Sequence, residues 1–287
     1  MDVREVDRVA FVFAGGGGLA AGQAGMLRAL AEAGIRPDLV IGSSAGALNA
    51  VAYATDPTPA GLERMETMWL SVRRRTVLPL SVARLAAALA GRGDGLVSTA
   101  ALRALIEHDL VAPRLTDTAI PAHVVVTDLA TGHPAVLSDE TAVTALLASS
   151  AFPGVFPPVP IDGRLYIDGG VAADTPVLQA EALGATTSYI LPAAAPTVTG
   201  PGVPHGAAPL AFHALNHLLH HAARADIAAA RGRIHVLPAP PATNPNPLAF
   251  HETSRLIEAG YNLTRTWLRR QEAQLITATS ANAPVAA

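Results

Sequence analysis

Short apolar runs alternate with helix-like segments over the first third of the chain. Residues 9–14 (VAFVFA) form an apolar run that ends in four glycines, which is typical of a buried strand entering a loop. Residues 22–33 place apolar side chains on one face and are followed by Gly34, so we expect a helix there. A second apolar run covers 38–42, and 45–54 has helical composition. This alternation with short joints predicts parallel strands joined by right-handed crossovers.

The same pattern continues along the rest of the chain. Strands are expected at 123–129, 164–168, 187–192 and 233–238. Helices are expected around Trp69, after Ser98, and over 139–149, 210–231 and 252–274. The sequence contains no internal repeat and no linker long enough to divide it. We therefore expect one α/β domain over residues 1–276, followed by a flexible C-terminal tail over 277–287.

Composition narrows the class of protein. Half of the 287 residues are apolar and 15% are charged, which excludes global disorder. No stretch approaches the roughly 20 apolar residues of a membrane-spanning helix. Residues 1–8 carry acidic groups and lack the apolar core of a signal peptide, so we expect a cytoplasmic protein with at most a peripheral association with membranes.

The residue types that are missing exclude several chemistries. The chain has no cysteine, which rules out disulfides, thiolate metal sites and a cysteine nucleophile. It also has no lysine, which rules out Schiff-base and Ser–Lys mechanisms. The net charge of −3 gives no reason to expect a nucleic-acid partner.

The strongest chemical motif fits the pattern G-x-S-x-G and runs from Gly42 to Gly46, with Ser44 at its centre. Small residues on both sides of a serine allow a tight strand-to-helix turn that exposes the hydroxyl. The motif lies between a predicted buried strand and a predicted helix, which is the context that a nucleophilic serine requires. A tight turn without catalytic function is the alternative interpretation.

A second motif is a run of four glycines: Gly15, Gly16, Gly17 and Gly18. Such a loop between a strand and a helix can present backbone N–H groups to an anion. One interpretation is a dinucleotide fingerprint with Ala20 as its third small residue, but the second strand then lacks the acidic residue that binds ribose. The other is an oxyanion hole beside Ser44, and we favour it because it uses both motifs.

A nucleophilic serine needs a base, and two aspartates follow predicted strands. Asp128 ends the strand at 123–129, and Asp168 ends the strand at 164–168 and precedes two glycines. In a parallel sheet the carboxyl ends of the strands gather at the edge that holds the Ser44 turn. Asp168 is the favoured base because the glycines after it permit a close approach to another backbone.

These motifs occur within three segments that resemble the patatin-like phospholipase family. The segments are 14–54 (AGGGGLAAGQAGMLRALAEAGIRPDLVIGSSAGALNAVAYA), 148–159 (ASSAFPGVFPPV) and 166–177 (YIDGGVAADTPV). The resemblance covers residues 10–192 in blocks. It implies a three-layer α/β/α fold with a mainly parallel central sheet and a lipid acyl hydrolase of the phospholipase A type that uses a Ser–Asp dyad without a histidine. The sequence shows no calcium loop or other metal motif, so we expect an activity that needs no metal or cofactor. Ser44 would then be the nucleophile, Asp168 the base and Gly15–Gly18 the oxyanion hole.

The sequence departs from the family pattern at three positions. Leu19 and Ala20 stand where the family commonly has a basic residue and a glycine, so an oxyanion would be held by backbone amides alone. Asp174 stands where the family often has asparagine. These changes leave the predicted Ser–Asp dyad intact and bear on rate and substrate preference.

Alternatives to a Ser–Asp hydrolase stay open at this point. The acyl-enzyme could pass its acyl group to an alcohol or lysolipid, which would make the protein a transacylase. His235 and His251 follow Asp168 in the chain, so a Ser–Asp–His triad of the α/β-hydrolase type is formally allowed. A catalytically silent lipid- or nucleotide-binding module is the alternative from a different class.

Two further segments carry weaker hypotheses. Residues 76–91, preceded by arginines at 73–75, could form an apolar lid that touches a lipid surface, although a packed helix is the plainer interpretation. His213, His217 and His221 recur every four residues, which could bind a metal, but no acidic or cysteine ligand accompanies them and we expect a polar helix face. The expected partner is therefore an acyl-ester lipid, met during transient contact with a membrane surface.

Overall fold

A central β-sheet organises the fold. The structure is a computed structural model that describes residues 7–73, 95–109, 112–196, 206–243, 246–247 and 250–281. Within these residues eight strands form one sheet, in the order β5-β6-β3-β2-β1-β7-β9 with β4 beside β3. The strands are β1 (Val9–Phe13), β2 (Leu39–Ser43), β3 (Ala122–Asp128), β4 (Pro134–Leu137), β5 (Val159–Ile161), β6 (Arg164–Asp168), β7 (Thr187–Leu191) and β9 (Arg233–Val236). A separate pair joins β8 (Ala195–Pro196) and β10 (Pro241–Ala242).

The five strands β3, β2, β1, β7 and β9 run parallel to one another. Their carboxyl ends therefore share one edge, where β2 leads directly into the turn at Ser44. The mainly parallel sheet predicted from the sequence is confirmed, and with helices on both faces it forms the α/β/α arrangement.

Strands β4 and β6 interrupt the parallel pattern because both run antiparallel to β3. Strand β2 pairs with β3 up to Val125, and β6 pairs with β3 from Val126 onward. Strand β4 pairs with residues on both sides of this boundary, so it must lie along the opposite edge of β3. Strands β2 and β6 therefore occupy the same side of β3 and point toward each other. Their last residues, Ser43 and Asp168, lie opposite these two consecutive valines.

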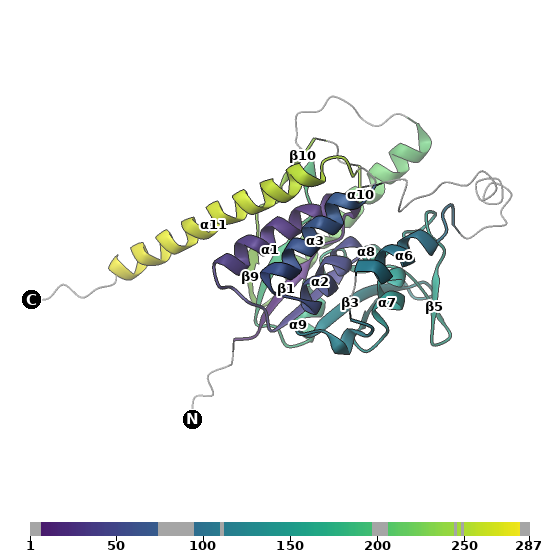
Figure 1. Cartoon of the computed structure of the whole chain (residues 1–287), viewed down its shortest axis with the longest axis horizontal. Helices are drawn as coiled ribbons and strands as arrows, with labels where there is room; N and C mark the ends of the chain where they lie inside the picture. The colour runs from purple at the N-terminus through teal and green to yellow at the C-terminus, as the bar shows by residue number, and fades with distance from the viewer. Residues whose placement is uncertain are drawn as a thin grey trace, which may run out of the picture.

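Helices cover both faces of the sheet. The first face carries α1 (Gly22–Glu32), α2 (Ala45–Thr55), α3 (Pro59–Ser71), α6 (Ala100–Asp109), α7 (Ala142–Ser149) and α11 (Thr253–Ala281). The second face carries α8 (Gly170–Ala173), α9 (Val177–Ala182) and α10 (Ala207–Ala229). The described residues also include two 3-10 helices, η1 (Gly17–Ala21) and η2 (Leu115–Asp117). Helix α11 lies along α1, so the last described segment packs against the first third of the chain (Figure 1).

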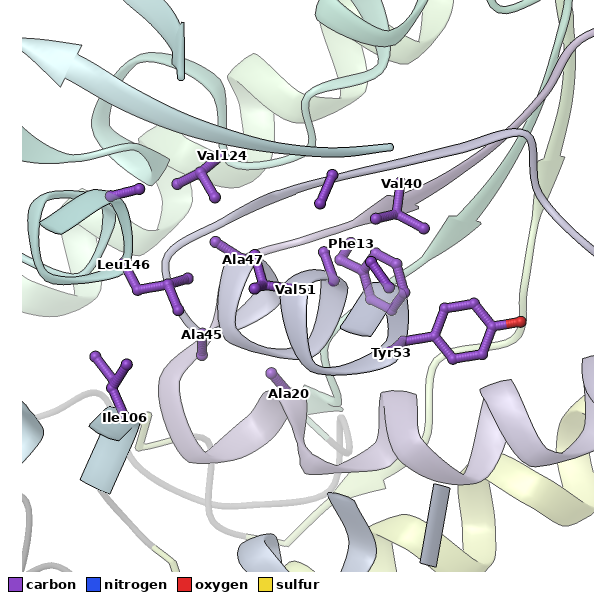
Figure 2. Packing of buried hydrophobic residues seen from close by; sticks show 14 of the residues in the cluster. Phe13, Ala20, Val40, Ala45, Ala47, Val51, Tyr53, Ile106, Val124 and Leu146 are labelled. Atoms are coloured by element: carbon purple, nitrogen blue, oxygen red, sulfur yellow. The ribbon is translucent and has the colours of Figure 1, made fainter. Parts of the chain in front are cut away.

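Strand alternation explains how the sheet fills two cores. Phe11 and Phe13 of β1 belong to the apolar cluster on the first face, whereas Ala10 and Val12 belong to the cluster on the second. Helix α2 packs directly on the first face, where the small side chain of Ala47 allows close contact with strand residues (Figure 2). This packing fixes the beginning of α2, and hence Ser44, against the sheet edge.

The structure corrects one assumption about Asp168. The strand at 164–168 forms as predicted, but it is antiparallel to β3, so Asp168 does not reach the site as the end of a parallel strand. The sequence-based prediction also missed β4 and β5, which are short and only partly buried. No described helix is long and apolar enough to cross a lipid bilayer. The lid hypothesis for 76–91 lies outside the described residues.

Candidate active site

Ser44 occupies a strained turn between β2 and α2. Its φ of 54° and ψ of −129° lie in a region that non-glycine residues rarely adopt. The flanking glycines are needed for space, because a β-carbon on Gly42 would lie 2.5 Å from Gly46 O and one on Gly46 would lie 2.5 Å from Phe13 O. The turn therefore presents the Ser44 hydroxyl at the start of a helix, where the positive end of the dipole favours negative charge.

Asp168 meets Ser44 at the junction of β2 and β6. The Ser44 hydroxyl donates a hydrogen bond to Asp168 Oδ2 at 2.7 Å, and the N–H of Gly170 donates to Asp168 Oδ1 at 2.8 Å. The buried hydroxyl of Thr127 donates to the Asp168 carbonyl oxygen at 2.8 Å and fixes the main chain there. The structure thus brings together the two residues that the sequence singled out as nucleophile and base.

The environment of Asp168 favours its neutral form. Burial raises the pKa of its carboxyl to about 7, and the nearby Asp174 carboxyl acts in the same direction. The hydrogen bonds from Ser44 and Gly170 oppose this shift by stabilising the carboxylate. A carboxyl group with a pKa near neutrality can both accept and return a proton, as acid–base chemistry requires.

Ser149 holds the two sides of the junction in register. Its hydroxyl accepts a hydrogen bond from Ser44 N–H at 2.8 Å and donates to Val125 O at 2.7 Å. Its carbonyl oxygen accepts from Gly169 N–H at 3.1 Å. Ser149 is fully buried and lies inside the segment 148–159 that carried part of the family resemblance. One residue therefore contacts the main chain at the nucleophile and directly after the base.

The four backbone N–H groups of the glycine loop differ in whether they have a hydrogen-bond acceptor. The N–H of Gly15 donates to Asp174 O at 3.0 Å, and the N–H of Gly18 donates to Pro247 O at 2.7 Å. Gly16 and Gly17 line the same cavity as Ser44, and their N–H groups have no hydrogen-bond acceptor among the described residues. Of the four glycines predicted for an oxyanion hole, Gly16 and Gly17 are thus the two whose N–H groups have no acceptor among the described residues.

A buried polar network fixes the glycine loop. Gln23 Nε2 donates to Ala14 O at 2.8 Å and to Leu191 O at 2.9 Å, which ties the end of β1 to the end of β7. Asn49 Nδ2 donates to Gln23 Oε1 at 2.7 Å, and Trp69 Nε1 donates to Asn49 Oδ1 at 2.7 Å. The sequence analysis missed Gln23 and Asn49. Each could have been recognised as a polar residue within an otherwise apolar stretch of a predicted helix. Gln23 lies in the helix after the glycine loop, and Asn49 lies in the helix after the Ser44 motif.

Ser44 and Asp168 open into a largely apolar cavity of about 170 Å³. Its walls come from helices α2, α3, α6 and α10 and from the segment that follows α7. The lining residues include Leu48, Trp69, Ile106, Phe156 and Leu219. Such a lining suits a hydrocarbon chain.

The other candidates from the sequence lie away from Ser44. Among the described residues that line the cavity there is no histidine. The His235 ring stacks on Tyr189 at 4.7 Å, and exposed His251 lies near Glu252. His213 and His217 face each other with their Nε2 atoms 3.0 Å apart, and the described residues contain no group of three potential metal ligands.

Comparison with known proteins finds related sequences. A profile of the patatin-like phospholipase family matches residues 11–181. Patatin-like phospholipase domain-containing protein 7 of Rattus norvegicus is 28% identical over 182 residues, which are 62% of this chain and 13% of that protein. An uncharacterized NTE family protein of Mycobacterium bovis is 30% identical over 171 residues, 59% of this chain and 44% of that protein. The chain thus spans less than half the length of these relatives.

Among solved structures, VipD from Legionella pneumophila aligns with 93% of this chain and 67% of its own. The TM-score is 0.41 at 14% sequence identity.

Proposed function

The chain belongs to the patatin-like phospholipase family, and on that premise we propose that it is a serine acyl-ester hydrolase that acts on lipids. The observation that carries the proposal is the 2.7 Å hydrogen bond from the Ser44 hydroxyl to a buried Asp168 carboxyl, at the wall of an apolar cavity. A serine hydroxyl is a weak nucleophile until a neighbouring base accepts its proton, and Asp168 is the group placed to do so.

The first half of the proposed reaction acylates the enzyme. Asp168 takes the proton of Ser44 as Oγ attacks the ester carbonyl carbon, and the electron pair of the C=O bond moves to its oxygen. The tetrahedral intermediate then collapses, the bond to the alcohol breaks, and Asp168 gives the proton to the departing alkoxide. A carboxyl whose pKa is about 7 suits both proton transfers.

The second half releases the acid. Water gives a proton to Asp168 while its oxygen attacks the acyl carbon on Ser44, and collapse of this second intermediate returns the proton to Ser44 Oγ. An alcohol or lysolipid in the place of water would give acyl transfer instead. The same residues serve both outcomes, since only the acceptor differs.

The amides of Gly16 and Gly17 are the donors that we assign to the oxyanion. They line the cavity beside Ser44, and no described residue uses them. A single oxyanion donor typically contributes about 2.7–4 kcal/mol to stabilisation of the transition state. Because Leu19 and Ala20 follow the loop, no basic residue comes directly after it in the sequence, and we assign this stabilisation to the backbone amides.

The competing proposals have less support. A Ser–Asp–His triad would need an imidazole within hydrogen-bond reach of Ser44 Oγ, whereas His235 packs against Tyr189 and His251 does not line the cavity. A silent binding module would not need the hydrogen-bonded dyad or the strained turn that holds it.

Covalent labelling with a fluorophosphonate probe tests the proposal. We expect wild-type protein to label, Ser44→Ala to lose labelling completely, and Asp168→Asn to label far more slowly. A panel of lipid esters should show hydrolysis that disappears in the same two variants. Labelling that persists in Ser44→Ala, or a wild-type protein that neither labels nor hydrolyses any ester, would refute it.

A further inference from the structure

A second carboxyl group lies beside the dyad. Asp174 follows α8 and lines the cavity, and its carbonyl oxygen accepts the Gly15 N–H at 3.0 Å, which fixes its main chain against the glycine loop. A β-carbon on Gly15 would lie 2.5 Å from Asp174 Oδ1 and 3.4 Å from Ser44 Cβ. A β-carbon on Gly170 would lie 3.1 Å from Asp174 Oδ1 and 3.0 Å from Asp168 Oδ1. Because both glycines lack a side chain, the Asp174 carboxyl reaches the space next to the nucleophile and next to its base.

The half-buried Asp174 carboxyl has no hydrogen-bond donor from the described part of the chain, and no basic side chain there stabilises its charge. Burial raises its pKa to about 6, so the group is a carboxylate at pH 8. A carboxylate can only accept hydrogen bonds, and leaving it without a donor away from bulk water is costly. The free enzyme does not supply this donor, because the Ser44 hydroxyl already pairs with Asp168. A donor from a reactant in the cavity would remove the cost.

Acylation of Ser44 frees one oxygen of its base. In the free enzyme Asp168 Oδ2 accepts the Ser44 hydroxyl, and Oδ1 accepts the Gly170 N–H. The acylated serine has no hydroxyl proton, so Asp168 Oδ2 loses its donor while Oδ1 keeps its own. Two carboxylates, those of Asp168 and Asp174, then lie near the acyl ester, and each can accept an O–H group. Water has two O–H groups to donate, whereas an alcohol has one.

We propose that Asp174 positions the water that hydrolyses the acyl-enzyme and thereby favours water over an alcohol as the acyl acceptor. This inference rests on the proposed function and concerns its second half. One proton of the water passes to Asp168 as the water oxygen bonds to the acyl carbon, and the other stays on that oxygen, hydrogen-bonded to Asp174. The bond from the acyl carbon to Ser44 Oγ then breaks, Asp168 returns its proton to Oγ, and the acid leaves with the second proton. An attacking alcohol would turn its carbon chain toward the Asp174 carboxylate, which desolvates the charge without giving it a hydrogen bond.

The fate of the acyl group tests this inference. With para-nitrophenyl butyrate and a fixed concentration of n-propanol at pH 8, nitrophenol release reports acylation, while butyrate and propyl butyrate, measured by gas chromatography, report the two acceptors. In Asp174→Ala we expect the ratio of propyl butyrate to butyrate to rise about tenfold, because water alone loses a hydrogen bond to a charged group. Asp174→Asn keeps an uncharged acceptor oxygen, so its ratio should lie between those of the wild type and Asp174→Ala. The kcat/KM for nitrophenol release should keep its wild-type value in both variants, since acylation does not use Asp174.

Asp109→Asn is the matched control. Asp109 also lines the cavity, but its carboxyl is already hydrogen-bonded to His108 Nδ1 at 2.9 Å, so its variant should keep the wild-type ratio of the two products. Thermal unfolding of each variant shows that it is folded, and Asp174→Asn serves if Asp174→Ala does not fold. A product ratio unchanged in Asp174→Asn, or a loss of kcat/KM for nitrophenol release as large as the loss of butyrate formation, would overturn the inference alone. A wild type that releases no nitrophenol would count against the proposed function, and the inference would fall with it.

Discussion

The two ends of β6 each involve a buried aspartate, and the two aspartates have opposite surroundings. Asp128 is the last residue of β3 and lies opposite Tyr166 of β6. It forms an ion pair at 2.9 Å with Arg164, the first residue of β6, and accepts the N–H groups of Ala130 and Thr131, each at 3.0 Å. Asp168, at the end of β6, meets one hydroxyl, one N–H and the carboxyl of Asp174.

These surroundings shift the two pKa values in opposite directions. Backbone hydrogen bonds, from Thr131 above all, lower the pKa of Asp128, and Arg164 adds to this effect. Burial raises the pKa of Asp168 to about 7. Sequence position made both residues candidates for the base, because each follows a strand. The comparison shows that the surrounding donors and charges, rather than the strand end itself, decide which aspartate can exchange protons at neutral pH.

The largest expected difference is in catalysis. We predict that Asp168→Asn lowers kcat/KM for an ester about 10³-fold, because a general base contributes 10²–10⁴-fold to catalysis and an amide cannot replace it. The matched exchange Asp128→Asn removes a carboxylate of equal size from the end of the neighbouring strand β3, and should cost less than about tenfold. Steady-state hydrolysis of one ester by both variants makes the comparison. Equal losses would show that Asp168 acts only by holding β6 in place.

Ser149 carries the next largest expected effect, since it fixes the junction where Asp168 meets the nucleophile. Ser149→Ala removes the acceptor of the Ser44 N–H and should lower kcat roughly 10–100-fold with little change in KM, because displacement of a catalytic group by 1 Å can cost 10²-fold. Loss of this buried hydrogen bond should also cost about 1–3 kcal/mol of unfolding free energy. Ser188→Ala, which removes a buried hydroxyl from β7, is the control for stability without an effect on kcat. If kcat fell equally in Ser149→Ala and Ser188→Ala, Ser149 would have no specific role in positioning the catalytic groups.

The contrast between the two aspartates also shows what the sequence could predict. The Ser44 side of the site was predictable because its signals are local: an apolar run, glycines with no space for a side chain, and a helix beginning in consecutive residues. All five parallel strands were expected from short apolar runs in the sequence.

On the other side of the site, the sequence indicated Asp168 as a candidate residue but did not predict how it reaches Ser44. The direction of β6 depends on pairing with β3 some 40 positions earlier, and no local pattern encodes that choice. The roles of Ser149, Gln23 and Asn49 also depend on contacts between distant segments. The occupied amides of Gly15 and Gly18 could not be distinguished from the open ones by composition, since all four residues are glycine.

The pH dependence of the reaction gives a sharper measure of the Asp168 environment. Asp168 must be ionised to accept the Ser44 proton, so kcat/KM should fall as the pH drops through about 7, rather than through the usual range of an aspartate near 3.8. Asp174→Asn removes a neighbouring carboxyl that raises this pKa, so the midpoint should move to lower pH. Asp128→Asn should leave the midpoint in place. A profile flat down to pH 5 would contradict the assignment of Asp168 as the base.

The smallest expected effect is on stability, and its sign differs between the two aspartates. The pKa of Asp168 is raised in the folded state, so its favourable contribution is present below about 3.8 and is lost as the pH rises to about 7. At pH 8 the buried carboxylate therefore destabilises the fold, and Asp168→Asn should raise the melting temperature by on the order of a few degrees.

The Asp128 carboxylate contributes stability above its unfolded pKa and loses it only as the pH falls through its lowered folded value, so Asp128→Asn should lower the melting temperature at pH 8. Thermal unfolding of both variants at pH 8 and pH 5 tests these signs, and the gain in Asp168→Asn should shrink at pH 5, where the wild-type carboxyl is already protonated. If Asp168→Asn melted below the wild type at both pH values, its hydrogen bonds would outweigh the cost of burying its charge. The strand end that we assign to chemistry would then be as much a structural anchor as the one at Asp128.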